Sequence, residues 1–367
     1  MKRKSVAQDV KPDTSKPTAI FEATEGRAYT VSVALPGSII INALTPELKT
    51  LLAGRIARAL AVFCVDEIVV FDDGQSKQQK GAKDHYHQNA DGGFTGFSDP
   101  NYFLMHLLSY LETPPFLRPF LFPLHPDLRF AGSLPSLDMP HHLKSHEWCR
   151  YREGVTIKKP MEGEKLKKPK KRKREEAQSK EASLVDVGLP QKISVPVAIP
   201  PDTRVTIKLP QDSNISASEN GSMTGSVVAP STPREEDGYY WGYGVRAAAS
   251  LSAVITECTY SGGYDLTIGT SERGSPVADL GRRTPDGDRV PQFNHMLVVF
   301  GGVAGLEVAV EADGELQKMG VKEPNELFDY WVNLCPGQGS RTIRTEEAVW
   351  LGLMGLRELV VDKGRKR

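Results

Sequence analysis

The chain has 367 residues, 39% hydrophobic and 25% charged, which is enough for one large domain or two ordinary domains with tails. Its 46 basic and 46 acidic residues leave no net charge, so overall charge neither favours nor excludes a nucleic-acid partner. No run of about eighteen apolar residues occurs, so we predict no membrane span. The first residues lack the apolar centre of a signal peptide, and residues 1–26 predict a disordered tail.

The first half of the chain predicts alternating strands and helices. YTVSVAL (29–35) is a β-branched run, and DEIVVFDD (66–73) is a second strand of the buried type. Between them, Thr45 and Pro46 are typical of a helix start, with threonine as the cap and proline in the first turn. This strand-helix-strand order favours a parallel sheet. A further amphipathic helix is predicted over 101–117, where a proline pair ends it.

Residues from about 145 to 237 have a different texture. Four short alternating segments (REGVTI, SLVDVG, KISVPVAI and TRVTIKL) predict strands separated by turns. The segment 211–238 is of low complexity and predicts a flexible stretch. Because the α/β texture resumes afterwards, this β module is predicted to be inserted rather than appended.

Three strand-like runs in the last third each end in a loop that carries glycine or proline: DLTIGT (265–270), MLVVFGG (296–302) and YWVNLCPG (330–337). In parallel α/β sheets, ligands bind outside the carboxyl ends of strands. The three loops therefore predict one small-molecule site.

The third loop continues as CPGQGSRTIRTEEA. Gly337 and Gly339 allow the backbone to approach a ligand without a Cβ clash, and backbone groups there could bind an adenine edge. Thr345 is predicted to cap the helix that follows. The alternative is a plain strand-to-helix connection. The loop lacks the spacing of a P-loop.

Other motifs each leave two interpretations open. Adjacent glycines in VVFGG favour close backbone approach, or a β-bulge. Glu272 and Arg273 in TIGTSERGS suit contacts to an anion, or a surface ion pair. Arg55 and Arg58 lie one turn apart on the first helix, and a solvated face is the alternative to a functional role.

His141, His142, His146 and Cys149 form a cluster whose spacing matches no common zinc pattern, so we predict no metal. The four cysteines of the chain are far apart, which predicts reduced thiols inside the cell. The run KKPKKRKRE (167–175) is typical of a nuclear-import signal, with a solvated loop as the alternative. No hydrolase elbow, metalloprotease or kinase motif is present.

These motifs together resemble a known family. GSRTIRTEEA (339–348) resembles the cofactor-loop motif of SPOUT-class RNA methyltransferases that modify uridine N3, and FGGVAGLE (300–307) resembles their second motif. GRIARALAVFCVDEIVVF (54–71) is similar to the first motif of the wider class. Together with RAYTVSVALPGSII, TIGTSERGS and CPGQGSRTIRTEEA, these motifs look very similar to the eukaryotic SPOUT-domain RNA methyltransferases.

The resemblance implies an α/β fold with a deep trefoil knot, S-adenosylmethionine as cofactor, and a homodimer. It implies a discontinuous methyltransferase domain over 27–143 and 238–365, and an inserted OB-like β-barrel over 144–237. Barrels of that kind commonly bind oligonucleotides. The implied location is the nucleus, in the nucleolus.

The resemblance also assigns residues. Arg58 would come from the partner subunit to meet the RNA, and Arg273 would lie near the cofactor carboxylate or the target base, with Glu272 as a possible base. The residues implied for the cofactor are Arg273, Gly301, Gly302, Gly305, Asn333, Leu334, Cys335, Gly339, Ser340, Thr342 and Ile343.

Two departures from the family pattern stand out. Leu52 and Ala53 stand where the wider class has Asn, which weakens a ribose 2′-O-methylation assignment, and Val303-Ala304 replace the Pro-Glu of the second motif. The implied function is an S-adenosylmethionine-dependent methyltransferase (EC 2.1.1 class) acting on uridine N3 of ribosomal RNA. The alternative is a non-catalytic scaffold that binds cofactor and serves ribosome assembly or spindle and kinetochore organisation.

Overall fold

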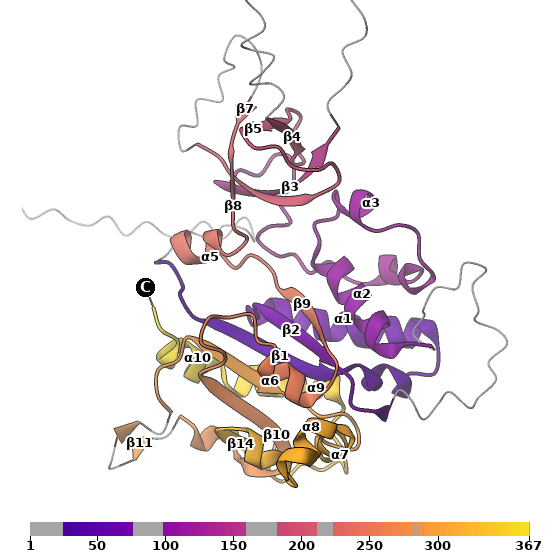
Figure 1. The fold of residues 1–367 in the computed structure, drawn as a ribbon, viewed down its shortest axis with the longest axis vertical. Helices are drawn as coiled ribbons and strands as arrows, with labels where there is room; N and C mark the ends of the chain where they lie inside the picture. The colour runs from indigo at the N-terminus through magenta and orange to yellow at the C-terminus, as the bar shows by residue number, and fades with distance from the viewer. Residues whose placement is uncertain are drawn as a thin grey trace, which may run out of the picture.

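The computed structural model describes residues 25–75, 98–158, 182–210, 223–281, 283–284, 287–288 and 290–366. A parallel sheet covered by helices forms one end of the molecule, and a small β module forms the other (Figure 1). The expected N-terminal tail and the basic run at 167–175 lie outside the described residues. Within the described residues, no helix is long and apolar enough to cross a bilayer.

The main sheet has six strands in the order β14-β10-β13-β1-β2-β9, and every neighbouring pair is parallel. The predicted parallel sheet is therefore confirmed. The strands are β1 (Thr30–Pro36), β2 (Glu67–Phe71), β9 (Gly244–Ala248), β10 (Leu266–Pro276), β13 (His295–Val299) and β14 (Tyr330–Asn333).

Both faces of this sheet are buried. Successive side chains of a strand point to opposite faces, so one strand contributes to two apolar clusters. In β2, Ile68 and Val70 join one apolar cluster, whereas Val69 and Phe71 join the other. Helices α1, α2, α9 and α10 supply the first cluster, and α6, α7 and α8 supply the second. The sheet is thus the middle layer of a three-layer α/β/α arrangement (Figure 1).

The first two helices begin where the sequence predicts, although α2 ends at Glu112, before the predicted end at 117. In α1 (Pro46–Val62), the Thr45 hydroxyl accepts a hydrogen bond from the Leu48 N–H at 3.3 Å, as expected of an N-cap. The others are α2 (Pro100–Glu112), α3 (Arg118–Leu121), α5 (Thr232–Asp237), α6 (Leu251–Thr256), α7 (Glu307–Ala312), α8 (Gly314–Met319), α9 (Thr345–Gly355) and α10 (Arg357–Lys363), with 3-10 turns η2 (Gly37–Asn42), η4 (Pro126–Leu128), η5 (Ala131–Ser133), η7 (Val277–Asp279) and η8 (Pro324–Leu327).

The β module, residues 151–228, closes on itself, and we call it the barrel. Its strand order is β7-β5-β4-β3-β6-β8, and the two end strands are halves of one segment interrupted only by Gly225. A Cβ on Gly225 would lie 2.6 Å from Cγ2 of Ile207, so glycine is required where this segment crosses the module's core. The strands are β3 (Tyr151–Ile157), β4 (Ser183–Asp186), β5 (Ile193–Val195), β6 (Arg204–Lys208), β7 (Met223–Thr224) and β8 (Ser226–Val228).

The four strands predicted for the module are confirmed, but the prediction for 211–238 is wrong over its second half. There the chain forms β7, β8 and α5. Low complexity hid these elements, because two-residue and three-residue strands are stabilised by their partners and not by a local pattern. Residues 211–222 lie outside the described residues.

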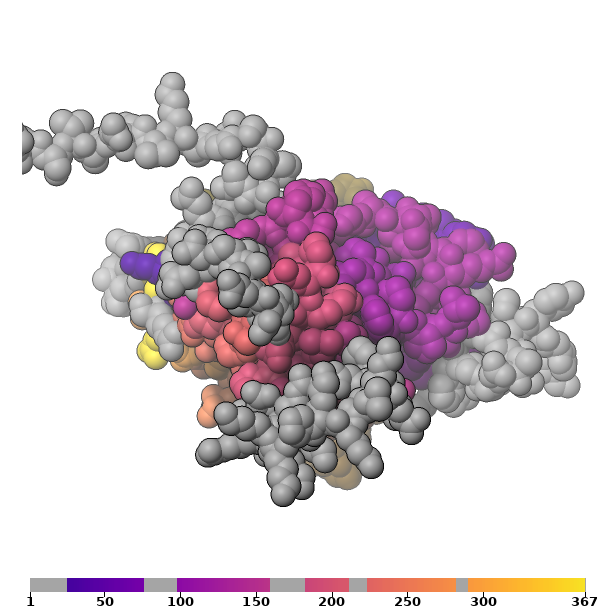
Figure 2. All heavy atoms as spheres, turned by 90° about the horizontal axis from the view of Figure 1, so that it is seen from above, coloured from indigo at the N-terminus to yellow at the C-terminus, as the bar shows by residue number. Residues whose placement is uncertain are grey.

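The barrel is fixed to the α/β domain through a buried polar cluster. The Arg204 guanidinium donates to Glu112 of α2 at 2.6 and 3.0 Å and to Glu153 of β3 at 2.6 Å. The Trp241 ring N–H donates to the same Glu153 at 2.7 Å. Seen from above, barrel residues lie directly against the residues that precede the barrel (Figure 2). We call Glu112, Glu153, Arg204 and Trp241 the junction cluster.

Candidate active site

The carboxyl ends of β10, β13 and β14 surround a cavity of about 430 Å³, as predicted from the three loops. β13 is the central strand of the three, so its loop forms the floor between the other two. The lining residues are Thr270, Ser271, Glu272, Arg273, Phe300, Gly301, Gly302, Val303, Ala304, Gly305, Glu307, Asn333, Leu334, Gln338, Arg341, Thr342, Ile343, Thr345 and Ala348.

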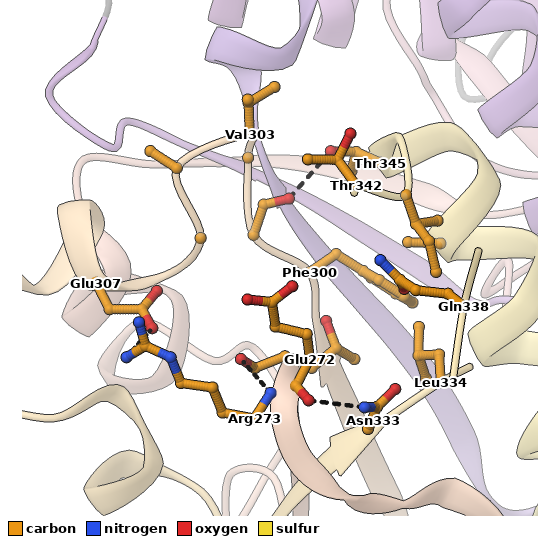
Figure 3. A pocket seen from close by; sticks show the side chains of 18 of the residues that line it. Glu272, Arg273, Phe300, Val303, Glu307, Asn333, Leu334, Gln338, Thr342 and Thr345 are labelled. Carbon is orange, nitrogen blue, oxygen red and sulfur yellow. Dashed lines mark hydrogen bonds and ion pairs between the residues drawn. The ribbon is translucent and has the colours of Figure 1, made fainter. Parts of the chain in front are cut away.

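The first wall comes from β10, which runs further than the sequence predicts. TSERGS was expected to be a loop, yet the strand continues to Pro276, with its pairing to β14 shifted between Thr270 and Ser275. Such an irregularity re-aims side chains. It directs Glu272 and Arg273 toward the cavity (Figure 3).

The floor comes from the loop after β13. Gly305 has φ +77°, and a Cβ there would lie 2.1 Å from a carboxylate oxygen of Glu307. A Cβ on Gly301 would lie 2.8 Å from the carbonyl carbon of Gly305. The backbone contact at Gly301 and the positive φ at Gly305 therefore favour glycine at both positions. Glu307 in turn lies 3.5 Å from Nη1 of Arg273.

Buried polar groups support this floor from behind. A Cβ on Gly302 would lie 3.6 Å from both Asp73 Oδ2 and Ser38 Oγ, which stand at the ends of β2 and β1. The Ser38 hydroxyl donates to the Asp73 carboxylate at 2.5 Å. Burial raises the pKa of Asp73, and the Ser38 hydrogen bond opposes that rise.

The second wall comes from the loop after β14. The Asn333 side-chain amide donates to the Glu272 carbonyl at 2.7 Å, and its oxygen accepts from the Cys335 N–H at 3.0 Å. Asn333 thereby joins the ends of β10 and β14 (Figure 3). Further along, the Gln338 side chain donates to the Ser340 carbonyl at 3.0 Å, which holds the glycine-rich turn in shape.

The start of α9 closes the cavity. Thr345 was predicted to cap this helix, and that prediction is wrong, because Thr345 is the first helical residue and Arg344 is the cap position. The Glu347 carboxylate accepts from the Arg344 N–H at 3.0 Å. The buried Thr345 hydroxyl instead donates to the Gly301 carbonyl at 3.0 Å. Thr345 thus joins the helix to the floor (Figure 3).

The charges around the cavity have few partners. The Arg273 side chain is 71% exposed even though it lies near Glu307. Glu272 and Arg341 are exposed as well. Opposite charges and apolar groups therefore line the same opening, with Phe300 and the β14 loop on the apolar side. Such a lining suits a zwitterionic ligand that also has a flat apolar part.

Most residues predicted for the site meet here. Glu272 and eight of the residues assigned to the cofactor line the cavity; those eight are Arg273, Gly301, Gly302, Gly305, Asn333, Leu334, Thr342 and Ile343. Cys335, Gly339 and Ser340 do not line it, although they belong to the turn that carries Gln338.

Arg58 lies outside the cavity of its own chain. Its Nη1 donates to the Leu137 carbonyl at 2.7 Å. Arg55, one turn earlier on α1, is 64% exposed and lies 4.0 Å from the buried Glu346 of α9. Action of Arg58 in the site of a partner subunit stays a prediction.

Sequence reasoning missed several lining residues, among them Phe300, Glu307, Gln338 and Arg341. Arg341 stands inside the predicted loop, and Glu307 ends the FGGVAGLE motif, so position in the motif could have indicated both. The sequence indicates Phe300 as the last residue of a buried strand. It is fully buried in the structure, and its place in the cavity wall depends on where the strand ends.

The histidines considered earlier for a metal are engaged in hydrogen bonds at the barrel junction. His141 Nε2 lies 2.9 Å from a Glu112 carboxylate oxygen, and His142 Nε2 lies 2.6 Å from the Glu112 carbonyl. Burial and the neighbouring His141 lower the pKa of His142 to about 3. His146 is exposed.

Comparisons with known proteins agree with this geometry. A family model described as "Putative RNA methyltransferase" matches residues 30–356. The chain is 44% identical over 345 residues to the 28S rRNA (uridine-N(3))-methyltransferase of Homo sapiens, covering 93% of this chain and 81% of that protein. It is 42% identical over 331 residues to the protein of the same name in Drosophila melanogaster, covering 90% and 62%. The SpoU methyltransferase AviRb of Streptomyces viridochromogenes, solved with AdoMet, aligns with TM-score 0.31 and 10% identity over 94% of this chain and 62% of that chain, which is too distant to support an argument.

Proposed function

The chain belongs to this RNA methyltransferase family, and on that premise we propose that it methylates N3 of a uridine in ribosomal RNA, with S-adenosylmethionine as methyl donor. The names of its relatives in human and fly supply the reaction and the class of RNA. The observation that carries the proposal for this chain is the cavity at the ends of β10, β13 and β14, where most residues predicted for the cofactor meet.

The lining fits this cofactor. A volume of about 430 Å³ suits a ligand of nucleoside size. Glycines at 301, 302 and 305 expose backbone groups, and Leu334 and Ile343 offer apolar contact to a flat base. Arg273 or Arg341 can meet the methionine carboxylate, and Glu272 or Glu307 can meet positive charge. When bound, the cofactor supplies an electrophilic methyl group on a sulfonium.

The chemistry assigns roles to two charged side chains. Uridine N3 carries a proton, which must leave before the nitrogen lone pair can act as a nucleophile. Both side chains line the cavity, and we assign Glu272 to accept that proton and Arg273 to stabilise the negative charge that develops on the uracil oxygens. The base must also be turned out of any stack, at a cost of a few kcal/mol, which favours an unpaired target.

We also propose that the protein works as a homodimer through α1 and α9, which pack side by side. Both helices carry exposed large apolar side chains, and a second copy of the chain would cover them. These side chains, with their exposed fractions, are Leu48 (49%), Leu51 (43%), Trp350 (36%), Leu351 (41%) and Met354 (65%). Arg58 lies on α1, so this arrangement could bring it to the partner's cavity.

Two inactive variants test both the dimer and the role of Arg58. Arg58→Ala and Arg273→Ala are each expected to lose activity as homodimers. After the two are mixed and re-paired, about a quarter of wild-type activity should return, because half of the dimers then hold one intact site. No recovery in a sample whose mixed dimers are demonstrated would show that the two arginines act in the same subunit.

Three further assignments complete the proposal. When β7 and β8 are counted as one interrupted strand, the barrel has five strands, and the third (β5) pairs in parallel with the fifth (β7). This is the strand connectivity of an OB-fold, so we assign the barrel to RNA binding. We assign the family's trefoil knot to the last third of the chain, and an experimental structure in which 295–356 passes through no loop would refute it.

We also place the protein in the nucleus, in the nucleolus, because of the basic run at 167–175. Fluorescence of tagged protein in the cytoplasm alone would refute this location.

The cofactor site is tested by two matched glycine variants. Gly305 and Gly320 have φ angles of +77° and +79°, so alanine costs each about 1–2 kcal/mol of stability, but only Gly305 lines the cavity. Calorimetric titration with S-adenosylmethionine should show binding by wild type and Gly320→Ala, and at least tenfold weaker binding by Gly305→Ala. Equal affinity in both variants would remove the cofactor from this cavity.

The reaction is tested by transfer of labelled methyl groups to ribosomal RNA, followed by nucleoside analysis. N3-methyluridine is the expected product. Cofactor binding without transfer to any RNA would instead favour the scaffold that assembles ribosomes or organises the spindle and kinetochore.

A further inference from the structure

A second cluster of chemically active side chains lies on α2 and on the segment after α3, among residues that the proposed reaction does not use. Among the described residues, His106, His125 and Asp127 form the one group of three whose potential metal-ligand atoms all lie within 4.8 Å of one another. His125 Nδ1 is 3.3 Å from Asp127 Oδ2, and His106 Nδ1 is 3.8 Å from the same oxygen.

One carboxylate oxygen of this group is buried and, among the described residues, makes no hydrogen bond. The Asp127 side chain is 3% exposed, and those of His106 and His125 are 11% and 18% exposed. Asp127 Oδ2 and His106 Nδ1 have no hydrogen-bond partner among the described residues. A buried carboxylate normally has hydrogen bonds or a positive charge beside it, because losing hydration costs several kcal/mol.

We propose that His106, His125 and Asp127 bind a zinc ion. A tetrahedral zinc with bonds of about 2.0–2.2 Å to nitrogen and oxygen separates its ligand atoms by roughly 3.3–3.6 Å. The separations of 3.3 and 3.8 Å are close to that value. Two imidazoles and one carboxylate favour zinc over magnesium or calcium, which prefer oxygen.

Aromatic neighbours hold the two imidazoles in place. The His106 ring stacks on Phe122 at 5.8 Å between centroids and meets the His125 ring edge-on at 4.9 Å. Among the described residues, the hydrogen bond that competes for these ligand atoms is the one that the Asp127 N–H donates to His125 Nδ1 at 3.3 Å, which is long and weak. The proposed zinc displaces only that bond.

The metal would join two segments of the chain. It would connect α2, which packs on the main sheet, to the 3-10 turn η4 in the segment that leads toward the barrel. Three protein ligands leave the fourth position to water.

The test uses the full-length protein, stripped with a chelator and titrated with Zn²⁺ alone. We expect one equivalent bound per chain, a rise in Tm on adding Zn²⁺, and loss of that rise in His106→Phe and Asp127→Asn. Zinc affinity should fall at least about 100-fold in each variant, because even outer-shell changes cost about 10–100-fold. Phenylalanine keeps the stack on Phe122 and removes the unpartnered nitrogen, so metal-free His106→Phe should melt no lower than metal-free wild type.

The exposed His146 supplies the control. His146→Ala should keep both the stoichiometry and the Tm rise, because it lies outside the group. Less than a stoichiometric amount of bound zinc in wild type would overturn the proposal. So would zinc that survives in His106→Phe and Asp127→Asn but is lost in His146→Ala, since this places the metal on other histidines.

Discussion

The cavity and the junction cluster both bring acids and arginines together, but they use them in opposite ways. At the junction, Arg204 donates to two carboxylates whose side chains are 7% and 3% exposed. At the cavity, Arg273 is 71% exposed, with its nearest carboxylate 3.5 Å away. Charges that are fully paired fix one part of the molecule against another, whereas charges left in an opening remain available to a ligand. The junction should therefore govern stability, and the cavity should govern activity.

The largest expected effect follows from removing the arginine of the junction. Arg204→Met leaves Glu112 and Glu153 buried without their cation, so the free energy of unfolding should fall by about 3–5 kcal/mol. Lys192→Met on the barrel surface is the matched control, because its pair with Asp186 is more exposed and should contribute at most about 1 kcal/mol. Urea unfolding measures both, and equal losses would show that the junction does not hold the barrel.

Removing an arginine at the cavity should instead lower activity and leave the free energy of unfolding nearly unchanged. Arg273→Ala is expected to lower kcat about 100-fold if it stabilises charge on the uracil oxygens. Its free energy of unfolding should stay within about 0.5 kcal/mol of wild type, since the side chain is exposed. Methyl-transfer kinetics measure the change in kcat, and urea unfolding measures the change in stability. A loss of stability large enough to explain the lost activity would contradict the contrast between cavity and junction.

The junction should also make stability depend on pH. The pKa of His142 is lowered from 6.5 to about 3 on folding, so the unfolded chain binds more protons between these values. His142 therefore contributes stability above pH 6.5, and this is lost as pH falls toward 3, at up to about 1.4 kcal/mol per pH unit. The pKa of Glu112 is raised by burial but lowered more by Arg204 and His141; this adds a loss below pH 4.5.

Glutamine in place of His142 separates the two contributions. His142→Gln can still donate to the Glu112 carbonyl but does not titrate, so stability should depend less steeply on pH between 6.5 and 5. Burial also lowers the pKa of His295, so a smaller slope of the same sign should remain. Exposed His146→Gln is the control and should keep the wild-type slope. An unchanged slope in His142→Gln would assign the pH dependence to another group.

The smallest effect concerns the connection between α9 and the floor of the cavity. Thr345→Val removes the hydroxyl that donates to the Gly301 carbonyl, which should cost about 1 kcal/mol of stability and weaken cofactor binding a few-fold. Thr256→Val removes a similar hydrogen bond on the exposed side of α6 and should leave cofactor affinity unchanged. Titration calorimetry compares the two, and an equal affinity would show that the floor keeps its shape without Thr345.

Near neighbours along the chain specify the local elements and the fold class. Side chains at helical spacing and β-branched runs are set by near neighbours, so α1, α2 and the strands β1, β2 and β13 could be predicted. The role of the glycines in the β13 loop could also be inferred from the sequence, because only glycine adopts φ +77° at Gly305 without strain. The three strand-end loops were enough to predict the cavity, and the family resemblance supplied nine of its nineteen lining residues.

The tertiary structure alone decided what depends on distant partners. β7 and β8 exist because β5 and β6 pair with them, and β10 extends past its predicted end because β14 continues beside it. Thr345 became a connection rather than a cap because the Gly301 carbonyl lies within reach. His106 and Asp127 are 21 positions apart in the sequence. They meet only when α2 and the turn η4 pack together. Hydrogen bonds and metal coordination depend on distance in space, so sequence spacing could not indicate this pair.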